Sequence, residues 1–163
     1  SDQSLAVHHG KRAVELDDRD AFTHLALGLA YWLVAKEFYA AIIELEEARR
    51  INPSDAQVQH AIGRTIIASG RAGEALPYLQ EAVRLSPADM MFGIFCAGLA
   101  YAHMCLRQYE QVVEWGRQTI RKLPPPGLVM AGTAAPPRRP CLSRARPGSQ
   151  LSSRGTDSHA ART

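Results

Sequence analysis

Histidine and cysteine are among the residue types of this 163-residue sequence that could hold a metal or take part in catalysis. None of the six histidines belongs to an H-E-x-x-H motif, and the adjacent His8 and His9 would point to different sides of a helix. The three cysteines are widely spaced and form no C-x-x-C pair, which argues against a zinc site and a disulfide framework. No G-x-S-x-G motif or glycine-rich phosphate loop is present either. We therefore expect no metal, no cofactor and no enzymatic activity.

Arg64 is the charged residue that most strongly suggests binding. It lies in the segment HAIGRTII, residues 60–67, where its close neighbours are mostly apolar. A charge in such surroundings usually has a partner, because leaving it unpaired is costly. With His60 and Ile67 it makes one side of the predicted helix polar and basic at its centre.

The elements that must position Arg64 are visible as an internal repeat. Pro53 and Pro87 lie 34 residues apart, and the segments before them, AAIIELEEARRINP and GEALPYLQEAVRLSP, match column by column. Upstream, LALGLAYWLVA, HAIGRTIIASG and FCAGLAYAHMC align on Gly28, Gly63 and Gly98. A repeat of this length predicts stacked helical hairpins, each burying its open side against the next.

These columns resemble the tetratricopeptide repeat (TPR) family over about residues 1–130. In that family the first helix carries a Leu-Gly-x-x-Tyr core, the second carries spaced alanines, and a proline ends the unit. The small positions of the second helix are matched by Ala41, Ala48, Ala75 and Ala82. The resemblance implies an all-α fold, a right-handed superhelix (α-solenoid) of about three hairpins with a partial unit before them.

The repeat columns divide the chain into units. We expect the second helix of a truncated preceding repeat, three full repeats, the start of an aborted fourth repeat and a tail, at residues 1–19, 20–54, 55–88, 89–124, 125–135 and 136–163. An array that starts half-way through a hairpin leaves an apolar flank uncovered, so we interpret the chain as a piece of a longer protein. The connection inside the first repeat is one residue longer than that of the second, and that of the third is two longer, which predicts insertions in these turns.

The first helices carry two apolar stripes. The family resemblance implies that the Gly-Tyr stripe packs within the array, while the other lines the concave groove that holds peptides or helices. Eleven residues fall on that groove: Phe22, Leu25, Leu29, Trp32, His60, Arg64, Ile67, Phe92, Phe95, Leu99 and His103. Such a groove is apolar at both ends and basic in the middle, and it suits an amphipathic helix or extended segment with apolar anchors and one carboxylate. It lacks the Lys and Asn pattern of the carboxylate-clamp subgroup, which argues against chaperone tails.

A second interpretation assigns these residues to packing. Phe22, Trp32, Phe92 and Phe95 would then be covered by neighbouring repeats, by another domain or by a second identical chain. The partner is thus either a protein or peptide ligand or another copy, giving a homodimer through the apolar groove or a self-associating structural array. If replacing Phe22, Trp32 and Phe95 by Ser unfolds the chain, the rings belong to the core.

The tail, residues 136–163, differs in composition from the repeats. It has six Arg, four Pro, five Ser and one acidic residue, which predicts disorder. Its charge is +5, six Arg minus Asp157, so residues 1–135 sum to about −2 within the net charge of +3. The tail is either a native basic arm that touches nucleic acid or an acidic partner, or the product of a frameshift. We favour the frameshift, because the fourth repeat stops inside a helix, and we do not expect nucleic acid as a partner.

Membrane association is not expected. The longest uncharged stretch, residues 90–106, is 17 residues long, contains His103 and falls on a repeat boundary. The N-terminus lacks the basic start and apolar run of a signal peptide. We therefore expect a cytoplasmic protein.

A narrower resemblance concerns two stretches, AVELDDRDAFTHLALGLAYWL and SGRAGEALPYLQEAVRLSPAD. They are similar to repeat arrays attached to bacterial class III adenylate or guanylate cyclases and related signalling proteins. This resemblance implies an alternative function, a regulatory or assembly domain of such an enzyme. The catalytic domain of the cyclases has no counterpart in the sequence, so no catalytic residue is carried over.

Overall fold

The computed structural model describes residues 2–122, in which every regular element is a helix. The expected all-α fold is therefore confirmed for this part of the chain. The proposed start of a fourth repeat and the arginine-rich tail lie outside the described residues.

The helices follow one another through short connections. α1 (Asp2–Leu16) precedes three hairpins. Their first helices are α2 (Ala21–Leu29) continued by η1 (Ala30–Ala35), then α4 (Ala56–Ala68), and α6 (Phe92–Cys105). Their second helices are α3 (Phe38–Ile51), α5 (Ala72–Leu85) and α7 (Tyr109–Lys122).

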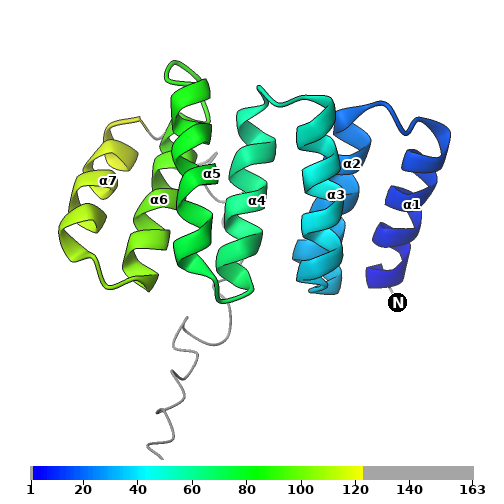
Figure 1. The fold of residues 1–163 in the computed structure, drawn as a ribbon, viewed down its shortest axis with the longest axis horizontal. Helices are drawn as coiled ribbons and strands as arrows, with labels where there is room; N and C mark the ends of the chain where they lie inside the picture. The colour runs from blue at the N-terminus through cyan, green and yellow to red at the C-terminus, as the bar shows by residue number, and fades with distance from the viewer. Residues whose placement is uncertain (1, 123–163) are drawn as a thin grey trace, which may run out of the picture.

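The helices stand side by side in chain order (Figure 1). The two helices of each hairpin pack against each other, and the second helices α3 and α5 also pack against the first helix of the next hairpin. α4 additionally touches α2 and α6, so the first helices of successive hairpins adjoin one another. A surface formed by the first helices therefore combines residues that are far apart in the sequence.

Aspartates mark the start of each hairpin. The Asp20 carboxylate accepts a hydrogen bond from the backbone N–H of Phe22, at 2.9 Å, and thereby caps α2. Asp55 accepts from the N–H of Gln57 at 2.8 Å and caps α4 in the same way. Asp89 binds the N–H of Met91 just before α6. These bonds satisfy backbone donors that the first turn of a helix leaves unpaired.

Small residues allow the two helices of a hairpin to approach closely. A Cβ built on Gly28 would lie 2.7 Å from Cγ of Leu45, and one on Gly63 would lie 2.6 Å from Cγ of Leu79. The predicted small columns of the second helices, Ala41, Ala48, Ala75 and Ala82, are fully buried. Gly98 differs, because a Cβ there would meet His60 Nε2 and the Leu79 side chain of the preceding hairpin.

A residue with positive φ ends the first helix of every hairpin. These residues are Lys36 (φ 62°), Gly70 (φ 89°) and Arg107 (φ 61°), each two positions before the second helix begins. At Gly70 the N–H of Arg71 reaches the Ile66 carbonyl, the bond that closes a Schellman motif. The tips of the three hairpins thus share one conformation, although only the second has the glycine that suits it.

The extra residue of the first hairpin lies inside its helix. Residues 30–35 form a turn of π-helix, in which the N–H groups of Lys36 and Glu37 both bond to the Tyr31 carbonyl. The sequence had indicated a longer turn at this place. A single inserted residue is accommodated by widening one helical turn, which keeps the backbone donors paired and leaves the tip unchanged.

Candidate functional site

Five of the eleven predicted groove residues lie in the interior. Their side chains are at most 7% exposed: Leu25, Ile67, Phe95, Leu99 and His103. They pack between helices, so the groove predicted from the stripe pattern loses these five as contact residues. Helical periodicity shows which residues share a side of a helix, but it does not show which sides neighbouring helices cover.

The other six predicted residues keep accessible surface. Phe22 is 69% exposed, while Leu29, Trp32, His60, Arg64 and Phe92 are partly buried. The accessible part of the predicted groove is thus centred on the first helices of the first two hairpins. Phe92 stands apart from this group, at the start of α6.

Arg64 is held between two aromatic rings. Its guanidinium carbon is 5.8 Å from the centre of the Trp32 ring and 5.4 Å from the centre of the Tyr101 ring. Both distances lie within the range of cation–π attraction. The three residues come from η1, α4 and α6, so Arg64 joins the first helices of three successive hairpins. The sequence placed Arg64 and Trp32 in the site but assigned Tyr101 to the inner stripe.

No carboxylate neutralises Arg64 within residues 2–122. Burial lowers the pKa of its guanidinium, and the neighbouring Tyr101 and Cys105 act in the opposite direction. An arginine keeps its charge under these conditions, because its pKa starts far above neutrality. The stack therefore presents one positive charge in aromatic surroundings, which is suited to a carboxylate or another planar anion.

His60 lies one helical turn before Arg64 and carries no charge. Its Nε2 atom is buried without a hydrogen-bond partner in the described part of the chain, and its ring centre is 5.3 Å from that of Phe95. Burial, together with the positive charge of Arg64, lowers the pKa of His60 to about 3. The imidazole is therefore neutral at physiological pH, and Arg64 supplies the positive charge of this helix side.

His103 has a structural contact at the end of α6. Its Nδ1 atom lies 2.6 Å from Oε1 of Gln108, so the imidazole N–H donates to the amide oxygen across the tip of the third hairpin. The bond fixes the buried ring. Although predicted for the groove, His103 lies among the buried residues, where this contact pairs its Nδ1 atom.

A second polar cluster joins α2 and α3. His24 Nδ1 lies 2.8 Å from Oε2 of Glu44, and its Nε2 lies 3.1 Å from the Asp18 carbonyl oxygen. Both partners are acceptors, so the doubly protonated imidazolium satisfies both contacts. Burial alone would lower the pKa of His24, but these two bonds and the charges of Glu44 and Glu47 outweigh it and raise the pKa. Nothing in the sequence except the presence of a histidine pointed to this cluster.

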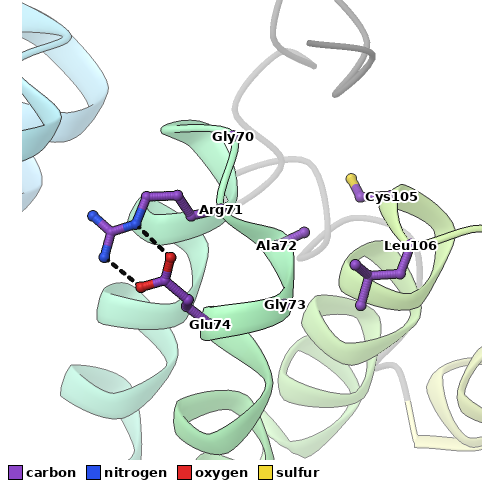
Figure 2. Close-up of a pocket in the computed structure, with 7 residues that line it drawn as sticks. All are labelled: Gly70, Arg71, Ala72, Gly73, Glu74, Cys105 and Leu106. Atoms are coloured by element: carbon purple, nitrogen blue, oxygen red, sulfur yellow. Dashed lines mark hydrogen bonds and ion pairs between the residues drawn. The ribbon is translucent and has the colours of Figure 1, made fainter. Parts of the chain in front are cut away.

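A shallow pocket opens beside the tip of the second hairpin (Figure 2). Arg71 and Glu74 face each other on one side of it and form two hydrogen bonds, at 2.9 and 2.6 Å. The other residues that line it are Gly70, Ala72, Gly73, Cys105 and Leu106. Because the two charges satisfy each other, the pocket offers a ligand less than the Arg64 stack does.

Two further features are missing from residues 2–122. No group of three histidine, cysteine, aspartate or glutamate side chains is placed there to hold a metal ion. No helix of this part combines the length and the apolar character needed to cross a bilayer.

No protein-family model matches the sequence, and no curated protein matches it at a significant level. The resemblance to tetratricopeptide repeats therefore stays a prediction from the repeat columns.

Proposed function

We propose that the chain is a non-catalytic protein-interaction module of the tetratricopeptide type. In this proposal the hairpins form a right-handed superhelix, and its concave face is made by the first helices α2, α4 and α6. The close crossings at Gly28 and Gly63 support it, because this family uses a small residue at that position. The contacts between successive first helices support it as well.

The observation that carries the binding proposal is the stack of Trp32, Arg64 and Tyr101. A guanidinium between two rings is fixed in orientation, and each cation–π contact stabilises it by about 0.5–1 kcal/mol or more. Its charge is not neutralised within the described residues. An arriving carboxylate would form a bidentate pair with an arginine that is already ordered, which reduces the entropy lost on binding.

The surroundings of the stack define the partner further. Leu29 precedes Trp32 of the stack by three residues and is partly buried, and Phe22 is exposed at the start of the same first helix. We propose a peptide or helix that places one carboxylate at Arg64 and an apolar side chain toward Leu29 and Phe22. This is a smaller contact than the groove of eleven residues that the sequence predicted, because five of those residues are buried.

A peptide library displayed on phage tests this proposal. We expect selection on the full chain to enrich peptides that combine an acidic residue or C-terminal carboxylate with apolar residues. The Arg64→Met variant keeps the apolar stem but lacks the charge, and should bind the selected peptides at least about tenfold more weakly in calorimetry. Arg64→Lys keeps the charge without the planar group and should lie between the two.

Arg12→Met provides the matched control. Arg12 is an exposed arginine of α1 that forms an ordinary surface pair with Glu15, so its loss should leave peptide binding unchanged. Circular dichroism establishes that each variant keeps its helix content. Equal binding of the selected peptides by wild type and Arg64→Met would refute the role of the stack.

A further inference from the structure

α7 exposes a stripe of apolar residues on its outer side. Tyr109, Val113 and Ile120 are 65%, 53% and 79% exposed, and Gly116 lies between Val113 and Ile120 on the same side of the helix. The spacing of four, three and four residues is that of a helix seam that packs against another helix. We call these four residues the open stripe.

The corresponding stripe of α5 shows what such a surface does when it is covered. α5 and α7 have the same length, and the residues of α5 that match the open stripe are Ala72, Leu76, Leu79 and Val83. Leu79 is fully buried between Gly63 of α4 and Gly98 of α6, and Val83 packs in a cluster with Phe95 of α6. The open stripe therefore lies at the position where the corresponding residues of α5 pack against the next helix, α6.

Gly116 makes the centre of the open stripe hollow. It stands where α5 has Leu79, and a Cβ built on Gly116 would meet no atom within 4 Å in the described part of the chain. A neighbouring helix could approach closely at this point, with Val113 and Ile120 packing on either side of the contact.

The charges beside the open stripe are ordered along the helix. By helical periodicity Glu110, Glu114, Arg117 and Arg121 all lie on one flank, with the acids in the first half and the bases in the second. Elsewhere in the chain a glutamate three residues before an arginine forms an ion pair, as Glu47 does with Arg50. Glu114 and Arg117 have the same spacing, yet none of the four residues on this flank is in an ion pair within residues 2–122.

We propose that two copies of the chain associate through α7, with the two α7 helices antiparallel about a two-fold axis. Such an axis keeps the charged flank of one helix opposite the charged flank of the other, in reversed order. Glu110 of one copy then faces Arg121 of the second copy, and Glu114 faces Arg117. A parallel pair would place the charged flank opposite the uncharged one and leave these charges without partners. The inference is independent of the binding role of Arg64.

The contact is small. One pair of 14-residue helices buries less than the roughly 1,200 Å² of a standard interface, so we expect a dimer that dissociates in the micromolar range. Sedimentation velocity of the full chain between about 1 and 500 µM should show a reversible shift from monomer to dimer.

Substitution of the open stripe is the first test. Ile120→Glu should shift the transition to at least about tenfold higher concentration, because it buries a charge at the contact. Tyr39→Glu on α3 is the matched control, because Tyr39 has the same 79% exposure as Ile120 but lies far from the open stripe in the sequence. Neither residue is buried, so both variants should keep their helix content.

Exchange of the charges tests the antiparallel orientation. Glu110→Arg with Glu114→Arg gives an all-basic flank and should abolish the dimer. Adding Arg117→Glu and Arg121→Glu reverses the whole order and should restore it. The fully reversed chain should pair with itself but not with the wild-type chain, since the mixed dimer would bring like charges together.

Three results would overturn the proposal. They are a monomer at every concentration, a dimer that Ile120→Glu leaves unchanged, and a dimer that tolerates the all-basic flank.

Oxidation of Tyr109 by hydroxyl radicals identifies any other occupant of the open stripe. We expect Tyr109 to become protected as the concentration rises. Protection that is independent of concentration would instead assign the stripe to the residues that follow α7 in the same chain.

Discussion

The helices α5 and α7 are each 14 residues long and hold the same place in their hairpins, but they differ in what covers them. α5 lies between α4 and α6, and its central Leu79 is completely buried. α7 packs against α6, and its apolar residues Val113 and Ile120 are more than half exposed. The two stripes match in position, but their residues differ, most strongly at the centre, where α5 has Leu79 and α7 has Gly116.

The difference shows that an apolar stripe becomes core only when a second helix covers it. The inner sides of both helices pack within their own hairpins. The outer side of α5 packs on the next hairpin, whereas that of α7 has no such neighbour within residues 2–122. Residues of the covered stripe and of the open stripe should therefore respond very differently to truncation, and the first of the following four experiments measures that difference.

Truncation of the two outer stripes should give the largest contrast. Leu79→Ala removes a fully buried side chain that contacts both neighbouring helices, and should cost about 2–5 kcal/mol of unfolding free energy. Ile120→Ala should change that free energy by less than about 0.5 kcal/mol at concentrations where the chain is monomeric. Urea titration measures both. Similar losses in the two variants would show that α7 is covered as α5 is.

Alanine in place of glycine should have opposite effects in the two hairpins. Gly63→Ala brings a Cβ to 2.6 Å from Cγ of Leu79, so α4 and α5 must separate, at a cost of about 1–3 kcal/mol. Gly116→Ala meets open space and should gain about 0.5–1 kcal/mol, because alanine favours the helix. Thermal unfolding at low concentration distinguishes the two. A stabilised Gly63→Ala chain would contradict the close crossing.

The tips of the same two hairpins offer a smaller contrast. Gly70 and Arg107 both have positive φ, which costs a residue with a side chain about 1 kcal/mol. Arg107→Gly should therefore stabilise the third hairpin by about 0.5–1 kcal/mol, and Gly70→Ala should destabilise the second by a similar amount. Chemical unfolding of both variants measures the changes. If both lose stability, the shared tip conformation is wrong.

The first hairpin extends the comparison to pH, with the smallest expected effect. The pKa of His24 is raised in the folded chain, so the imidazolium contributes its full stabilisation at pH values below the pKa that His24 has in the unfolded chain. This stabilisation is lost as the pH rises through the pKa that His24 has in the folded chain. The loss should be less than about 1 kcal/mol. In the second hairpin the corresponding residue is Gln59, whose amide donates to the Pro53 carbonyl and does not titrate.

His24→Gln gives the first hairpin the residue that the second hairpin has at this position. It should remove the part of the pH dependence of stability that comes from His24. Urea midpoints measured from about pH 5 to pH 9 give the comparison, with the difference between wild type and variant as the readout. A difference that stays constant over this range would show that His24 does not titrate with the fold.

The hairpins could be predicted because their signals are local. The prolines mark where the first two repeats end, and the glycine and alanine columns identify the close crossings of the first two hairpins. The third crossing was less predictable, because the side chains nearest to Gly98 are His60 and Leu79 of the preceding hairpin. The third repeat keeps the glycine column in its first helix, but its second helix has Gly116 at the position where α5 has Leu79.

The candidate site was only partly predictable. Arg64 could be identified, because a charge among apolar neighbours is unusual in a helix. Leu25 and Phe95 could not be excluded from the groove, because both stripes of a first helix are apolar and the sequence does not state which is covered. Tyr101 was missed because the family pattern assigns its column to the interior. Its tyrosine hydroxyl is polar, and that was the one available signal.

The widened turn of η1 has a consequence for how the hairpins tolerate change in length. The first hairpin carries one residue more than the second before its tip, yet Gly28 meets Leu45 in nearly the same geometry as Gly63 meets Leu79. Variation in length is confined to the end of the hairpin that lies away from the crossing. Foreign segments such as epitopes or labels are therefore best inserted next to Lys36, Gly70 or Arg107, where the hairpins already differ in length without a change in how their helices meet.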